Sequence, residues 1–178
     1  MALAASMDSE AQRIIAQRLF GRVQRLVRML LGNAADAEDA TQLSLVEILR
    51  SAGGYRGESS LEHWADRVTV RTALRLAKKR REAENLVDQD ADLESLPERD
   101  ETRGADPQRA ERLLAQLSPS LREVVVLRHV MGHSVTESAR ELGVSPNTVK
   151  DRLVRARQKL RSLVRRDDFL SDAKMRGA

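Results

Sequence analysis

The chain contains no cysteine, so it can form neither disulfide bonds nor thiolate metal sites. Aromatic residues make up only 2% of the sequence, so a packed core must be built from leucine, valine, isoleucine and alanine. No segment reaches the roughly 18 consecutive apolar residues of a membrane-spanning helix. The first residues lack the basic region of a signal peptide, and Asp8 and Glu10 interrupt their short apolar run. These absences predict a cytoplasmic protein without membrane insertion.

Several signatures of catalysis are also missing, including a glycine-rich phosphate loop, a nucleophile elbow and the pattern HExxH. His129 and His133 have the spacing of zinc ligands on a helix. However, Gly132 predicts a helix end between them, and no cysteine is available to complete the site. We therefore expect no enzyme activity, no metal and no cofactor.

Charge divides the chain into three parts. Residues 1–81 carry a net charge of +5, residues 82–106 carry −8, and residues 107–178 carry +7. A basic block attracts a polyanion, whereas an acidic segment is repelled by it. Because the acidic segment is also poor in apolar residues, it predicts a flexible linker. We therefore expect domains at 1–81 and 107–165, a linker at 82–106 and a tail at 166–178.

Helical periodicity dominates the first block. Apolar residues recur at helical spacing over 9–31, and Gly32 with Asn33 predicts the end of this helix and the cap of the next, which extends to about 51. Ser59 and Glu62 predict a capping box at the start of a third helix. Trp64 on this helix is expected in the core. The same helix presents side chains spaced by four on one face, suited to contact phosphates: His63, Arg67, Arg71 and Arg75.

In the second block, helical pattern resumes at Pro107, and Ser118 with Pro119 predicts another helix start. The run EVVVLRHV at 123–130 has the composition of a strand. The preceding cap and the apolar spacing nevertheless favour a helix, which Gly132 should end.

A helix-turn-helix follows. Ser134 and Glu137 form the pattern of a capping box, which predicts a short helix over 135–142. Gly143 supplies the left-handed residue of a sharp turn. A second helix should begin with a cap and a first-turn proline, Ser145 and Pro146. Such a pair of helices places its second member in the DNA major groove.

The second helix has two distinct faces. A buried face is predicted by apolar residues at helical spacing: Val149, Leu153, Ala156, Leu160 and Leu163. The opposite face carries Asn147, Thr148, Lys150, Asp151, Arg152 and Arg155. Amide and guanidinium groups near the start of this helix can read base edges, and the other cations can hold phosphates. An ordinary solvated helix is the alternative interpretation.

The whole arrangement resembles bacterial RNA polymerase sigma factors of the extracytoplasmic-function type, group IV of the sigma-70 family. LLGNAADAEDATQ and YRGESSLEHW resemble sigma region 2, and the stretch from LSPSLREVVVLRHV to VRARQKLR resembles region 4. The resemblance covers about residues 10–81 and 108–165. It implies an all-α fold with two small helical domains, region 2-like and region 4-like, joined by the acidic linker.

The resemblance implies that the chain binds core RNA polymerase and promoter DNA and is held inactive by an anti-sigma factor. Region 4 would bind the −35 element through Ser145, Asn147, Thr148, Lys150, Arg152 and Arg155. Region 2 would melt and read the −10 element through Arg56, Ser59, Ser60, His63, Arg67, Arg71 and Arg75. The polymerase would dock on Asp39, Gln42, Leu43 and Val46. The linker would lie in the RNA exit channel.

Five positions depart from the family pattern, and two of them are Arg71 and Ser138, which replace an asparagine and an isoleucine. Leu43, Leu45 and Leu49 stand where these sigma factors usually carry a glutamate, an aromatic residue and a tryptophan. They motivate an alternative, a sigma-like helix-turn-helix regulator that does not bind core polymerase. A second alternative is a helical interaction adaptor whose cationic faces bind an acidic protein.

Overall fold

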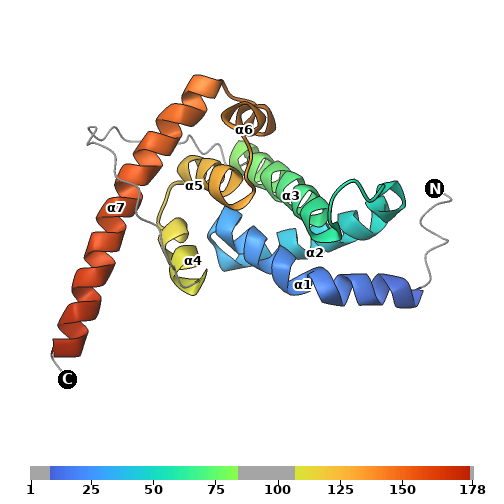
Figure 1. Cartoon of the computed structure of the whole chain (residues 1–178), viewed down its shortest axis with the longest axis horizontal. Coiled ribbons are helices and arrows are strands. Elements are labelled where there is room, and N and C mark those ends of the chain that lie inside the picture. The colour runs from blue at the N-terminus through green and yellow to red at the C-terminus, as the bar shows by residue number, and fades with distance from the viewer. Residues whose placement is uncertain (1–8, 84–106, 177–178) are drawn as a thin grey trace. The chain divides into compact units, whose positions relative to one another are not determined.

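Figure 1 shows the computed structural model of the chain, which describes residues 9–83 and 107–176, with side chains placed as far as residue 167. Every regular element within these ranges is a helix, so the predicted all-α class is confirmed. The chain divides into two compact units, unit 1 (Met1–Val87) and unit 2 (Asp88–Ala178). Among the described helices, none combines the length and apolar character that crossing a bilayer requires. Most of the predicted linker at 82–106 lies outside the described residues.

Unit 1 is a bundle of three helices that all pack on one another, α1, α2 and α3. Their bounds are Ser9–Leu31, Ala34–Ser51 and Leu61–Ala83, and the short 3₁₀ turn η1 spans Ala52–Gly54. The expected end of α1 is confirmed, since Gly32 has a φ of 72°. The Asn33 side chain caps α2 by accepting a hydrogen bond from the Asp36 N–H at 2.8 Å. The leucine, valine and isoleucine pattern thus folds as expected.

Ion pairs join the three helices of unit 1 around their apolar core. Asp66 of α3 is buried and accepts two hydrogen bonds from Arg22 of α1, at 2.7 and 2.6 Å. This paired geometry raises the pKa of Arg22. Further pairs join Arg18 to Glu62 at 2.6 Å, and Arg80 to Asp36. Because α1 and α2 are both tied to α3 in this way, the orientation of α3 in the bundle is fixed.

Over residues 107–176, unit 2 consists of four α-helices and one π-helical turn. The α-helices are α4 (Pro107–Ala115), α5 (Pro119–Val125), α6 (Val135–Leu142) and α7 (Pro146–Arg176), and the π turn η2 spans Val126–Val130. The run at 123–130 is therefore helical, as predicted. Val124, Val126 and Leu127 are fully buried, so burial outweighs the weak helix propensity of valine.

Arg122 ties α4 to α5 from inside unit 2. Only 5% of this residue is exposed. Its guanidinium donates hydrogen bonds to the carbonyl oxygens of Leu114, Ala115 and Leu117, at 2.9, 3.3 and 2.7 Å. Burial lowers the pKa of Arg122. A buried cation thus bonds to carbonyl oxygens at the end of α4 and in the turn after it.

The last helix is longer than expected. It continues through the predicted domain end at 165 to Arg176, so residues 166–176 are helical rather than a separate tail. The physical reason is that no glycine or proline interrupts the sequence between Pro146 and Gly177. Arg109 of α4 also bonds to Asp167 at 2.9 Å, which anchors α7 beyond that boundary.

Candidate nucleic-acid interface

The first helix of the predicted helix-turn-helix begins with the expected capping box. The Ser134 N–H donates to Glu137 Oε2 at 2.7 Å, and the Glu137 N–H donates to Ser134 Oγ at 3.1 Å. These hydrogen bonds lower the pKa of Glu137. Gly143 then ends α6 with a φ of 66°. The chain therefore turns at the residue that the sequence indicated.

The second helix is fixed by a cap and by a buried joint. Ser145 Oγ accepts a hydrogen bond from the Thr148 N–H at 3.0 Å and lies 2.8 Å from Thr148 Oγ1. One turn into α7, the fully buried Val149 packs with Ala139 of α6 and Val124 of α5. The small side chain of Ala139 lets the helices approach closely. This joint sets the angle at which α7 leaves the turn.

The faces of α7 follow the predicted pattern, except that two of the five apolar residues are only half-buried. Val149, Ala156 and Leu163 are buried, while Leu153 and Leu160 are half-buried. On the other side, Ser145, Asn147, Lys150 and Asp151 are exposed, whereas Thr148, Arg152 and Arg155 are half-buried. The first turns of α7 therefore present a polar and cationic surface next to a helix N-terminus. Its contact with DNA stays a prediction.

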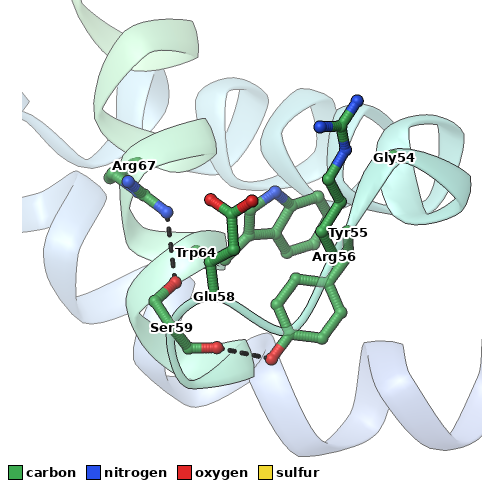
Figure 2. Close-up of a pocket in the computed structure, with 7 residues that line it drawn as sticks. All are labelled: Gly54, Tyr55, Arg56, Glu58, Ser59, Trp64 and Arg67. Atoms are coloured by element: carbon green, nitrogen blue, oxygen red, sulfur yellow. Dashed lines mark hydrogen bonds between the residues drawn. The ribbon is translucent and has the colours of Figure 1, made fainter.

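In unit 1, the loop before α3 folds around side-chain hydrogen bonds (Figure 2). The Tyr55 hydroxyl donates to the carbonyl oxygen of Ser59 at 2.6 Å, and Arg67 Nη2 donates to Ser59 Oγ at 3.1 Å. The Tyr55 and Trp64 rings lie 5.3 Å apart between centroids, at an angle of 47°. Ser59 is thus bonded both to Tyr55, which precedes it in the loop, and to Arg67, which follows it on α3.

This loop and the first turns of α3 line a small pocket that is open to solvent (Figure 2). The residues that line it are Gly54, Tyr55, Arg56, Glu58, Ser59, Trp64 and Arg67. Trp64 is half-buried, because the pocket leaves part of its ring uncovered. The expectation that Trp64 lies in the core is therefore wrong. An aromatic wall with polar groups around it can accept a flat heterocycle.

The capping box predicted at Ser59 and Glu62 is also wrong. Helix α3 begins at Leu61, and Ser60 is its cap, accepting a hydrogen bond from the His63 N–H at 3.2 Å. The cap is thus shifted by one residue, and the Ser59 hydroxyl accepts a hydrogen bond from Arg67 instead. Glu62 instead pairs with Arg18, and hydrogen bonds from its own N–H and from Arg18 lower the pKa of Glu62.

The predicted cationic stripe does lie on one exposed face. His63, Arg67, Arg71 and Arg75 are all exposed along α3. The other side of the helix is held by the Arg22–Asp66 pair and by buried Ala65 and Thr69. The stripe therefore starts at the pocket, through Arg67, and continues along α3. The structure brings together most of the residues expected to bind the −10 element, with Ser60 exposed at the cap.

The residues expected to bind polymerase form a stripe on α2. Asp39, Gln42, Leu43 and Val46 are all exposed. Leu43 is 45% exposed and Val46 is 40% exposed, which leaves apolar surface in contact with water. Leu45 and Leu49 are half-buried. Of the three unusual leucines, Leu43 therefore has the most access to a partner.

Sequence reasoning did not identify Tyr55 and Trp64 as parts of the site. The signal for them was weak, because an aromatic residue on an apolar helix face is usually a core residue. In the part of the chain that the structure describes, no three histidine, cysteine, aspartate or glutamate side chains gather as a metal site would need.

Comparisons with known proteins point to one family. The model of sigma-70 region 2 matches residues 15–83, and the model of sigma-70 region 4 matches residues 108–160. These segments contain the pocket and stripe of unit 1 and the helix-turn-helix of unit 2.

Whole proteins agree with this result. The ECF RNA polymerase sigma factor SigE of Mycolicibacterium smegmatis is 36% identical over 79% of this chain and 56% of its own length. SigM of Mycobacterium tuberculosis, of the same description, is 31% identical over 80% of this chain and 71% of its own length. The solved structure of CnrH in complex with the cytosolic domain of CnrY matches with a TM-score of 0.50 and 25% identity, over 93% of this chain and 95% of that one. The chain belongs to the ECF RNA polymerase sigma factors of the sigma-70 family.

Proposed function

We propose that the chain is an alternative sigma factor, which binds core RNA polymerase and directs promoter-specific initiation of transcription without catalysis of its own. One observation carries the proposal. Both sigma regions occur in one chain, and each presents an exposed cationic surface next to a structured reading element. A protein that delivers polymerase to promoters would act in the cytoplasm.

Unit 2 would anchor the complex at the −35 element. The capped start of α7 would present the exposed side chains of Asn147 and Lys150 to the major groove. The half-buried Arg152 and Arg155, on the same turns of α7, would contact bases or phosphates. The buried joint at Val149 supports this geometry, because it leaves the reading helix little freedom to tilt.

Unit 1 would capture the −10 element after strand separation. An extruded base needs an aromatic wall and polar partners, and the pocket beside Trp64 provides both. The stripe of His63, Arg67, Arg71 and Arg75 would hold the neighbouring phosphates of the single strand.

The exposed stripe of α2 would dock on polymerase, with Leu43 and Val46 adding an apolar contact to the polar one of Asp39 and Gln42. An anti-sigma factor is the expected protein inhibitor. The solved structure of CnrH with CnrY supports a protein partner, because a related chain there forms a complex with a second protein.

Purified chain and core polymerase test this proposal. Co-elution of the two on size exclusion, followed by core-dependent RNA synthesis from genomic DNA, is the expected result. Arg152→Ala should lower transcription at least about tenfold, the loss of one good base or phosphate contact, and leave co-elution unchanged. Lys159→Ala, at an exposed position further along α7, is the matched control. Absence of any complex with core polymerase would favour the non-polymerase regulator instead.

A further inference from the structure

We infer that the pocket of unit 1 selects an unpaired base that carries an exocyclic amino group and rejects thymine, with Glu58 as the residue that selects. This inference rests on the proposed capture of a −10 base by the same pocket. It adds which chemical class of base the pocket accepts, and through which side chain.

The position of Glu58 is unusual for a surface that faces DNA. Glu58 lines the pocket together with Arg56 and Arg67. No ion pair with another described residue neutralises its carboxylate. A carboxylate beside a polyanion is electrostatically unfavourable. Its cost is offset if the carboxylate accepts a hydrogen bond from the base itself.

The chemistry of the base edges then decides the preference. An ionised carboxylate only accepts hydrogen bonds. Cytosine, adenine and guanine each offer an amino group on the Watson–Crick edge, whereas thymine offers two carbonyl oxygens that flank a single N–H. A thymine in this pocket would therefore place at least one carbonyl oxygen near the carboxylate of Glu58. The guanidinium of Arg56 or Arg67 can donate to the ring acceptor beside an amino group.

The remaining walls hold the base without reading it. Trp64 and Tyr55 provide aromatic surface, and every base has a face that can stack on it. The hydrogen bond from Arg67 to Ser59 fixes one side of the opening. Stacking thus contributes affinity for any base, whereas the hydrogen-bonding groups around Glu58 discriminate among the bases.

The chain contains its own probe for this test. Trp64 is the only tryptophan in the sequence and lies in the pocket, so a base that stacks there should quench its fluorescence. The full chain is titrated at low salt with short single-stranded oligonucleotides that differ at one nucleotide. The decisive pair is 5-methylcytosine and thymine, which share the methyl group and differ in the group at C4, amino or carbonyl, and in the proton at N3.

We expect 5-methylcytosine to bind about tenfold more tightly than thymine, the discrimination of one good edge contact. In Glu58→Gln, whose amide both donates and accepts, the ratio should fall to about twofold or less. Glu38→Gln, at an exposed position on α2, removes the same charge outside the pocket and should keep the wild-type ratio.

Three results would overturn the inference: equal binding of the two nucleotides by the wild type, a ratio that survives in Glu58→Gln, or no quenching by any oligonucleotide. These failures are distinguishable from failure of the proposed function. A chain that supports core-dependent transcription but shows no preference in the pocket is still a sigma factor, whereas a chain that supports no transcription is not.

Discussion

The two surfaces that we propose to face DNA are held in place by different kinds of interaction. In unit 2, buried contacts hold the start of α7 at the Val149 joint, and the buried guanidinium of Arg122 holds α4 to α5. In unit 1, the pocket is set by hydrogen bonds of a surface loop, from Tyr55 and Arg67 to Ser59. Buried contacts stabilise a whole domain, whereas surface hydrogen bonds mainly order the loop that they join. Mutations at the Val149 joint should therefore destabilise unit 2 as a whole, whereas mutations in the loop of unit 1 should reshape the pocket without unfolding that unit.

The largest effect is expected in unit 2. Arg122→Ala removes three hydrogen bonds to carbonyl oxygens at and just after the end of α4 and should lower the free energy of unfolding by about 3 kcal/mol. Urea unfolding of the full chain, followed by circular dichroism, should show the loss. Fluorescence of Trp64, which reports only on unit 1, should not change. Arg112→Ala, at an exposed position on α4, serves as the control, and an equal loss in both variants would contradict the role given to Arg122.

A smaller effect is expected at the ion pair of unit 1. Asp66→Asn removes the charge that receives two hydrogen bonds from Arg22 and should lower the free energy of unfolding by about 1.5 kcal/mol. The value is moderate because half of the Arg22 side chain is exposed. In this variant, the urea unfolding transition followed by Trp64 fluorescence should shift to lower urea concentration. Arg25→Met, at a neighbouring exposed position on α1, is the control. If this variant shifts the transition equally, the Arg22–Asp66 ion pair does not hold α3 in place.

Next in size is the capping box of α6. Ser134→Ala should lower the free energy of unfolding of unit 2 by about 1 kcal/mol, again seen by circular dichroism and not by fluorescence. An unchanged midpoint would show that the hydrogen bonds at the start of α6 contribute nothing to the stability of the helix-turn-helix.

The same cap predicts a pH dependence. The pKa of Glu137 is lower in the folded chain than its ordinary value of 4.5. Its contribution to stability is therefore complete above pH 4.5 and is lost as the pH falls through the folded pKa. The Glu137→Gln variant should lack this part of the pH dependence. Urea midpoints of the wild type and of the variant, measured at a series of pH values below 4.5, should therefore become equal at the lowest pH.

The smallest change in stability belongs to the loop. Tyr55→Phe removes one hydrogen bond to the Ser59 carbonyl and should cost about 0.5 kcal/mol. Its effect on single-stranded DNA should be larger than its effect on folding, because the pocket wall loses its anchor. The comparison of the two units would fail if this variant unfolded unit 1 as a whole, or left oligonucleotide binding unchanged.

Local chemistry explains which features were predictable from the sequence. Ser134 and Glu137 interact within the first turn of α6, and Gly143 acts at its last turn. Because each interaction is local, these roles can be predicted from spacing alone. The cap of α3 could not be read in this way, because Ser59 and Ser60 are adjacent and equally suitable. The choice depends on Arg67, which lies eight residues away in the sequence and engages Ser59.

Tertiary contacts account for the other differences. Arginine is almost always exposed, so nothing in the sequence indicated the buried position of Arg122. Trp64 was expected in the core on its apolar character, and only the fold of the neighbouring loop leaves its ring open to a pocket. The residues expected to bind DNA and polymerase rest on family resemblance, and their exposure fits those roles, which are predictions that binding experiments must test.

Transcription in vitro with core polymerase and a library of randomised promoters tests the central claim most directly. If one chain reads DNA with both units, the RNA-yielding promoters should share two sequence elements at a constant separation. Arg152→Ala should relax selection in the upstream element alone, and Glu58→Gln in the downstream element alone. Transcripts that depend on only one element, or no transcripts above those of core polymerase alone, would contradict the account.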